Sequence, residues 1–171
     1  MEEFWPTSMV PVTINRGLSL GKYEVVHVFR NLEDSPGLKR MIPAETERHR
    51  FLATTHVEVV DEDTYMWTDD EDGHVNVGRE YLSKGEEVYL YLDILHELMH
   101  VRQFKDGREL FDTKYEYVER PTEVEAYRFV VDEARILGLS DEKIYDYLRV
   151  EWVTKSQHDD LARRLGVKVG I

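Results

Sequence analysis

Two histidines and a glutamate near the middle of the chain have residue types and a spacing that suit metal-assisted chemistry. The run His96-Glu97-Leu98-Met99-His100 matches the pattern HExxH. Four residues are just over one helical turn, so on a helix the two imidazoles lie on one face about 5–6 Å apart. Imidazoles at this separation can bind one Zn²⁺, and the Glu between them can serve as a general base. The motif predicts His96 and His100 as zinc ligands and Glu97 as a catalytic residue.

The residues around the motif predict that its helix is buried. Between residues 88 and 101 every side chain is apolar or Tyr except Asp93, His96, Glu97 and His100. At about 100° per residue, these four polar residues share one sector of about 100°. Buried charge is costly unless it is paired or bound to a metal. The pattern favours a metal site over the alternative of core histidines that are hydrogen-bonded to Asp93 and Glu97.

A catalytic zinc needs a third protein ligand, and the sequence offers two placements. In the pattern HExxHxxGxxH, a Gly bends the chain so that the last residue returns to the metal. Gln103 replaces that Gly here, so we expect the helix to continue and to carry Asp106 away. The other source is a later helix with Glu123 and Glu125. Glu123 lies at the centre of its apolar stripe and Glu125 on its polar side, which predicts Glu123 as the ligand.

An HExxH helix followed by a helix that supplies a Glu resembles the gluzincin clan of zinc metallopeptidases. The small size is most similar to the minimal archaeal minigluzincins. The run 123–129 is similar to the second motif of bacterial repressor-cleaving metallopeptidases. The resemblance covers about residues 51–138. It implies a zincin-like fold, a peptide or protein substrate, and a strand at 74–77 against which the substrate aligns.

The residue that orients the first His of the motif in the larger gluzincins is different in this chain. Larger gluzincins have an Asp four residues after the ligand Glu, where it orients the first His of the motif. That position is Tyr127 here, so we expect a different orienting group or Asp93 in that role. An oxyanion partner usually comes from another segment, and Tyr115, Tyr117 and His158 are candidates among which the sequence does not choose.

The expected reaction is hydrolysis of a peptide bond by zinc-activated water, with Glu97 as the proton acceptor. Two alternatives stay open. In one, zinc stabilises a non-catalytic binding or regulatory domain, or the site is latent because residues 140–171 lie over the cleft. In the other, the chain is a metal-free domain that binds a partner.

The elements that must position these residues change type along the chain. The first half is rich in β-branched and aromatic residues, and the hairpin is expected around residues 61–63. Predicted strands are 23–30, 51–60, 64–68 and 74–77, and residues 33–50 are expected to be a loop with one helical turn. Predicted helices are 86–105, 121–137, 140–149 and a last one that Ser156 and Asp159 cap and Gly166 ends. The order predicts an α+β fold, in which an N-terminal antiparallel β-meander precedes the HExxH helix and a C-terminal group of helices.

Composition narrows the chemistry further. The chain has 171 residues, no Cys, and 22 basic against 35 acidic residues, for a net charge of −13. The length predicts one domain, 1–171, with a C-terminal helical extension at 139–171. Without Cys, a metal must be held by His, Asp or Glu. The negative charge opposes nucleic acid or an anionic membrane as partner. The start of the chain has no leader-like segment, which favours a cytoplasmic protein; the sequence does not indicate the oligomeric state.

Two further segments have simpler interpretations. Residues 61–72 contain seven acids, but their spacing lacks the alternation of a calcium-binding EF-hand loop and favours a solvated hairpin tip. Residues 156–169 are similar to the first half of a helix-turn-helix. We expect them to form a terminal amphipathic helix that packs on the domain.

Overall fold

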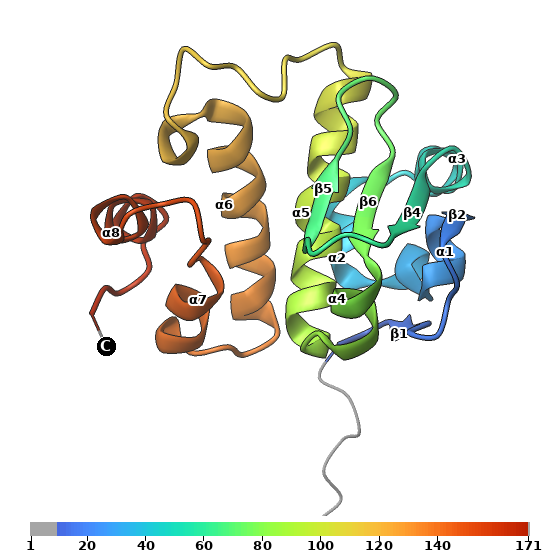
Figure 1. Cartoon of the computed structure of the whole chain (residues 1–171), viewed down its shortest axis with the longest axis horizontal. Helices are drawn as coiled ribbons and strands as arrows, with labels where there is room; N and C mark the ends of the chain where they lie inside the picture. The colour runs from blue at the N-terminus through green and yellow to red at the C-terminus, as the bar shows by residue number, and fades with distance from the viewer. Residues whose placement is uncertain (1–9, 171) are drawn as a thin grey trace, which may run out of the picture.

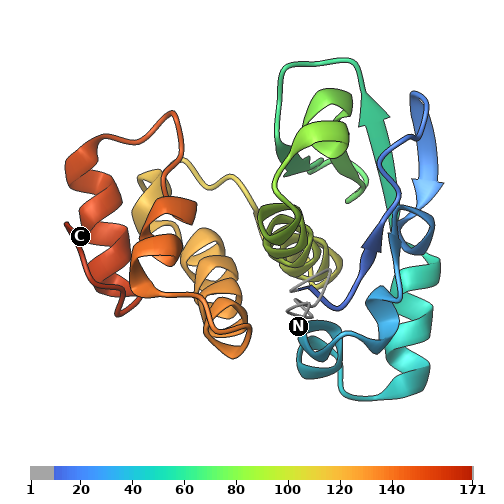
Figure 2. The same ribbon diagram turned by 90° about the horizontal axis from the view of Figure 1, so that it is seen from below.

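Residues 10–170 are described by the computed structural model, and they form an α+β protein with eight α-helices and two small sheets. The long helix α5 (Glu87–Lys105) lies at the centre (Figure 1). A four-stranded sheet packs on one side of α5, and the helices α6 to α8 lie on the other (Figure 2). The α+β class predicted from the sequence is confirmed.

The main sheet is mixed, so the predicted antiparallel meander is wrong. Its order is β2 (Gly21–Glu24), β4 (His56–Val60), β6 (Val75–Gly78) and β5 (Met66–Thr68). Strands β4 and β6 are parallel, whereas β2 and β5 pair antiparallel with their neighbours. The hairpin is therefore formed by β5 and β6 around residues 69–74, the first four of which are acidic, and β4 and β5 do not pair.

The first 55 residues contain more helix than the sequence indicates. The predicted strand 23–30 is interrupted by the turn α1 (Val25–Val28), after which β3 (Phe29–Arg30) pairs with β1 (Thr13–Ile14). The expected loop 33–50 contains most of η1, all of α2 and most of α3, and α3 continues three residues into the predicted strand 51–60. Their bounds are Leu32–Asp34, Pro36–Met41 and Glu45–Ala53.

The reason for the error at α2 is local. Ser35 and Pro36 suggested a turn that closes a strand, but Pro is also favoured at the first position of a helix. In the structure the Ser35 Oγ caps α2 by accepting a hydrogen bond from the Leu38 N–H at 3.2 Å. The same residue types therefore begin a helix here.

The helices of the second half lie close to their predicted positions. After α4 (Arg79–Lys84) come α5, η2 (Tyr117–Glu119), α6 (Pro121–Ile136), α7 (Asp141–Tyr147) and α8 (Lys155–Arg164). Gly107 and Gly138 follow α5 and α6 with left-handed φ values of 78° and 86°, a conformation in which glycine commonly ends a helix. The cap of α8 differs, because Thr154 and Gln157 form the capping box in place of Ser156 and Asp159.

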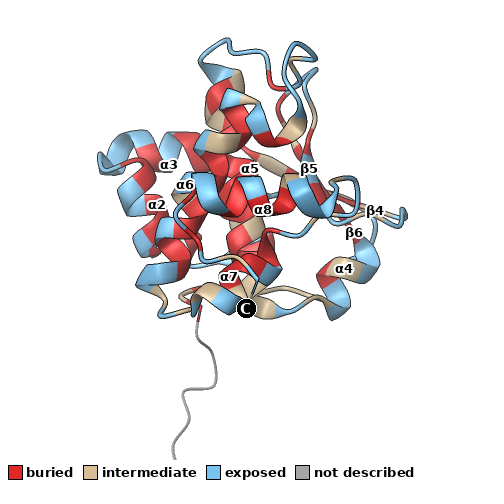
Figure 3. Cartoon of the chain, turned by 90° about the vertical axis from the view of Figure 1, so that its left-hand side faces the viewer, coloured by how far each residue is buried: buried red, intermediate tan, exposed pale blue. Residues whose placement is uncertain are grey.

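Helix α5 is buried on nearly all sides, as its sequence predicts (Figure 3). Leu90, Leu95 and Leu98 are fully buried, and each contributes about 1.5–3 kcal/mol to folding through loss of apolar surface. α5 contacts β5 on one side and runs antiparallel beside α6 on the other (Figure 1). Within residues 10–170, no helix combines the length and the apolar character needed to cross a membrane.

Candidate metal centre

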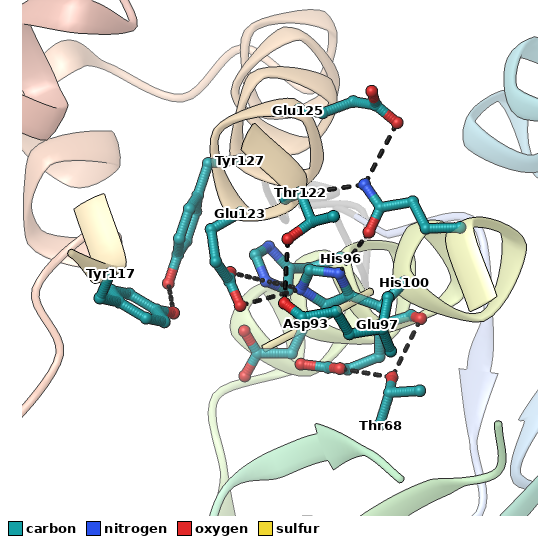
Figure 4. Close-up of polar contacts among 12 residues, drawn as sticks. Thr68, Asp93, His96, Glu97, His100, Tyr117, Thr122, Glu123, Glu125 and Tyr127 are labelled. Atoms are coloured by element: carbon teal, nitrogen blue, oxygen red, sulfur yellow. Dashed lines mark hydrogen bonds and ion pairs between the residues drawn. The ribbon is translucent and has the colours of Figure 1, made fainter. Parts of the chain in front are cut away.

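The two histidines of α5 and the first-turn glutamate of α6 converge on one point (Figure 4). The Nε2 atoms of His96 and His100 are 3.1 Å apart. Glu123 Oε2 lies 3.1 Å from His96 Nε2, and Glu123 Oε1 lies 3.2 Å from His100 Nε2. Ligand atoms held about 2.0–2.1 Å from a tetrahedral zinc are separated by about 3.3 Å. The three side chains therefore fit the ligand set of a single zinc ion.

A hydrogen-bond chain fixes the tautomer of His100. The Gln103 Nε2 donates to the Thr122 carbonyl at 3.0 Å and to Glu125 at 3.1 Å, which leaves the Gln103 Oε1 as an acceptor. That oxygen lies 2.7 Å from His100 Nδ1, so Nδ1 carries a proton, and Nε2 presents a lone pair when the ring is neutral. A lone pair on Nε2 is the form of imidazole that binds a metal.

The centre also favours a positive charge. Burial alone would lower the pKa of His100, but the hydrogen bond and charge of Glu123 outweigh it and raise that pKa to about 9. Burial likewise opposes ionisation of Glu123, yet the two histidines hold its pKa well below the usual range. A carboxylate between two imidazole nitrogens attracts a cation, which is either a proton or a metal ion.

Among the described residues, no carboxylate is hydrogen-bonded to His96 Nδ1 to orient the ring, as the Asp of the larger gluzincins does. Its Nδ1 is buried and has no hydrogen-bond partner among the described residues. The ring of Tyr127 packs against it with the ring centroids 4.3 Å apart. Asp93 does not take the orienting role, because it accepts hydrogen bonds from Tyr81 and Tyr147 instead. Of the two alternatives that the sequence left open, the structure therefore contains a different arrangement around His96 and not Asp93 as its hydrogen-bond partner.

Glu97 lies beside the cluster and has a separate partner. Its Oε2 accepts a hydrogen bond of 2.7 Å from the hydroxyl of Thr68 on β5. Burial raises the pKa of Glu97, although both histidines and Thr68 oppose this shift. The described residues make no hydrogen bond to its Oε1. The histidines contact Glu123 and not Glu97 or Asp93, so the alternative of core histidines paired with those two acids is not what the structure contains.

A cavity of about 340 Å³ adjoins the cluster. His96, Glu97, His100 and Glu123 line it together with residues from β5, η2 and the segment 146–152. The segment 146–152 thus forms one wall of the cavity. The alternative that residues 140–171 lie over the cleft includes this segment, but the sequence did not indicate which of its residues line the cavity.

The cavity separates the three oxyanion candidates. Tyr117 lines it, and its hydroxyl lies 2.6 Å from that of Tyr127. Tyr115 is 44% exposed and is not among the lining residues. His158 is buried elsewhere, with its ring stacked on Tyr145 and its Nε2 2.7 Å from the Tyr145 carbonyl oxygen. Of the three, only Tyr117 contributes to the cavity wall.

The rejected ligands lie away from the centre. Helix α5 continues to Lys105, and Asp106 is exposed. The side chain of Glu125 is 48% exposed and pairs with Arg108 at 2.9 Å. A second group, Asp69, Asp72 and His74, could also hold a metal by distance. It lies at the hairpin surface, where Asp72 is already hydrogen-bonded to His74.

Strand β6, expected to align a substrate, has both edges occupied. It pairs with β4 on one side and β5 on the other. Strand β5 is the last strand of the sheet and pairs on one edge only. Met66, Trp67 and Thr68 of β5 all line the cavity. The strand with an open edge beside the candidate centre is therefore β5.

Comparison with protein-family models, curated proteins and solved structures gave no match.

Proposed function

We propose that the protein is a zinc-dependent metallopeptidase with a zincin-like arrangement of the HExxH helix α5 and the ligand-bearing helix α6. The single observation that carries the proposal is the convergence of His96 Nε2, His100 Nε2 and the Glu123 carboxylate beside the buried Glu97. A bound zinc would polarise a carbonyl and lower the pKa of water at the open fourth position toward about 7. The absence of Cys agrees with this His-His-Glu set.

Glu97 supplies the proton transfer in this proposal. One of its oxygens accepts a hydrogen bond from Thr68, and the other has no hydrogen-bond partner among residues 10–170. Glu97 also lines the cavity. Burial raises its pKa, which suits a carboxylate that must accept a proton from water and then return it to the leaving amine.

The Tyr117 and Tyr127 pair supplies a hydrogen-bond donor. Burial raises the pKa of both hydroxyls well above the ordinary value, so both stay protonated. The pair has two hydroxyl hydrogens, and the contact between the two oxygens uses one of them. The remaining O–H can donate to the substrate oxygen as negative charge develops on it.

Replacing Glu97 by Gln tests the proposal. We expect hydrolysis of an unstructured protein by the zinc-loaded chain to fall by about 10²–10⁴-fold, since general-base catalysis is lost. Zinc content should stay unchanged, because Glu97 is not in the ligand set. Glu80→Gln, an exposed change on α4, is the control and should leave the rate unaltered. An unchanged rate in Glu97→Gln would refute the catalytic assignment.

A non-catalytic zinc-stabilised domain is the second candidate, because the three ligands join α5 to α6. It predicts one zinc per chain and a higher melting temperature with metal, but no hydrolysis by the wild type. Protein purified without chelators that contains no metal would instead favour the metal-free domain. Release of a latent site by removing residues 140–171 is disfavoured, because Ile144, Leu148 and Leu161 are fully buried and their loss would unfold the chain.

A further inference from the structure

The mouth of the cavity carries an unusual concentration of exposed aromatic side chains. Among residues 10–170, seven large hydrophobic side chains are exposed, and four of them line this cavity. These four, which we call the aromatic rim, are Tyr65, Trp67, Phe111 and Trp152, and they are between 38% and 62% exposed. Exposed apolar side chains scattered singly are ordinary, but a cluster around a cavity marks a binding site.

Two members of the aromatic rim, Tyr65 and Trp152, are held in place by neighbouring side chains. Tyr65 meets Tyr81 edge-to-face with the ring centroids 5.1 Å apart, and its hydroxyl donates to Glu151 at 3.4 Å. Trp152 meets Tyr117 edge-to-face at 5.4 Å. Rings that are already packed lose little freedom on binding, so a ligand gains more of the contact energy.

The open edge of β5 adds a second binding element. Trp67 is the middle residue of this strand and is its exposed member, whereas Met66 and Thr68 are buried. An extended polypeptide can pair with an open strand edge through backbone hydrogen bonds, while its side chains enter neighbouring pockets. Trp67 therefore places one part of the aromatic rim directly on the strand that a peptide would join.

Charge and size limit the occupant. The cavity lining contains five acidic side chains, among them Asp146 and Glu151, against the two basic side chains Arg120 and Arg149. This excess of acids opposes a polyanion such as a nucleic acid. A volume of about 340 Å³ suits a short segment of chain and not a folded domain.

We infer that this cleft binds an extended polypeptide segment through a large apolar side chain, which the aromatic rim receives. The inference deepens the proposed function by naming the substrate class. It rests on that function for the reaction, whereas binding itself can be measured without hydrolysis.

The test uses the zinc-loaded full chain with Glu97→Gln, so that binding is separated from cleavage. Two fluorescently labelled eight-residue peptides of equal charge, one with a central Phe and the other with a central Ser, are titrated by anisotropy. We expect the Phe peptide to bind about tenfold more tightly. Adding Trp152→Ala should weaken binding of the Phe peptide by about tenfold and leave the Ser peptide nearly unchanged. Phe111→Ala is a second variant with the same expected direction.

Ile136→Ala is the matched control, because Ile136 is 59% exposed but does not line the cavity. It should change neither affinity. Equal affinities for the two peptides, no measurable binding of either, or no effect of both rim variants would overturn the inference. Discrimination between the peptides without hydrolysis by the wild type would refute the proposed function and leave the inference standing. Hydrolysis by the wild type with equal affinities for the two peptides would support the proposed function and refute the inference.

Discussion

Two acidic side chains in the same cleft, Glu123 and Asp93, are stabilised by partners of different chemistry. Glu123 faces two imidazoles, which overcome the effect of burial and lower its pKa. Asp93 faces two tyrosine hydroxyls, and burial raises its pKa in spite of them. Imidazoles can share a cation with a carboxylate, whereas hydroxyls offer only dipoles. Glu123 therefore belongs to a cation site, and Asp93 ties α5 to α4 and α7.

The largest difference between the two carboxylates should appear in metal binding. Glu123→Ala removes one of the three proposed ligands, so we expect zinc affinity to fall by at least about 100-fold. This is more than is typical when a residue that only hydrogen-bonds to a ligand is replaced. Asp93→Asn should retain about one zinc per chain, because Asp93 touches no ligand nitrogen. Equilibrium titration against a chelator of known affinity measures both. Glu125→Ala removes a charge on the same helix turn and one of the two acceptors of Gln103 Nε2, so we expect a smaller loss of affinity. Equal loss in it and in Glu123→Ala would refute the ligand assignment.

A smaller effect is expected where Asp93 meets α7. Tyr147→Phe removes a hydroxyl that donates to Asp93 at 2.8 Å, so the buried carboxyl loses one of its two donors. We expect the free energy of unfolding to fall by about 1–3 kcal/mol. Urea unfolding of the metal-free proteins measures it. Tyr115→Phe, at an exposed ring, should stay within about 0.5 kcal/mol of the wild type. Equal losses of stability in the two variants would show that the hydrogen bond from Tyr147 to Asp93 does not stabilise the fold.

The smallest effect is the pH dependence of that hydrogen bond. The pKa of Asp93 is raised above its ordinary value of 3.8 by burial, so the native state holds the proton more tightly than the unfolded state does. Ionisation then costs native stability. As pH rises from about 4 through the native pKa, the metal-free wild type should lose stability relative to Asp93→Asn. Urea unfolding of both proteins between pH 4 and 7 measures the difference, and a difference independent of pH would show that the carboxyl ionises as freely as in the unfolded chain.

The centre itself was predictable because its geometry is local to two helices. The helical period placed His96, Glu97 and His100 in one sector of α5. The same period distinguished Glu123, which is buried, from Glu125, which is exposed. Gly107 and Gly138 lie just after the ends of α5 and α6, where glycine favours the end of a helix. These features follow from the backbone of single elements and need no knowledge of how the chain packs.

The parts that could not be predicted depend on contacts between distant segments. Val25–Val28 has the β-branched residues of a strand but forms a helical turn, because strand preference depends on available partners. Gln103 suggested only that a helix continues. Its role in orienting His100 requires Thr122 and Glu125 from α6. Residues 140–171 were placed over the cleft in one alternative, but nothing in the sequence of residues 146–152 singled them out as the part that lines the cavity.

The contacts between α5 and α6 make the proposed metal centre dependent on how these two helices are aligned. The first turn of α6 supplies both the ligand Glu123 and the two acceptors that hold Gln103 against His100. About ten residues further along α6, Glu133 accepts hydrogen bonds from Tyr91 of α5 at 2.8 Å and from Arg40 of α2 at 3.1 Å. Sliding one helix past the other by a single turn, about 5.4 Å, would separate both sets of partners together. Metal binding would therefore depend on the alignment of α5 and α6. A substitution that disturbs the contacts of Glu133 would be expected to change metal occupancy at Glu123.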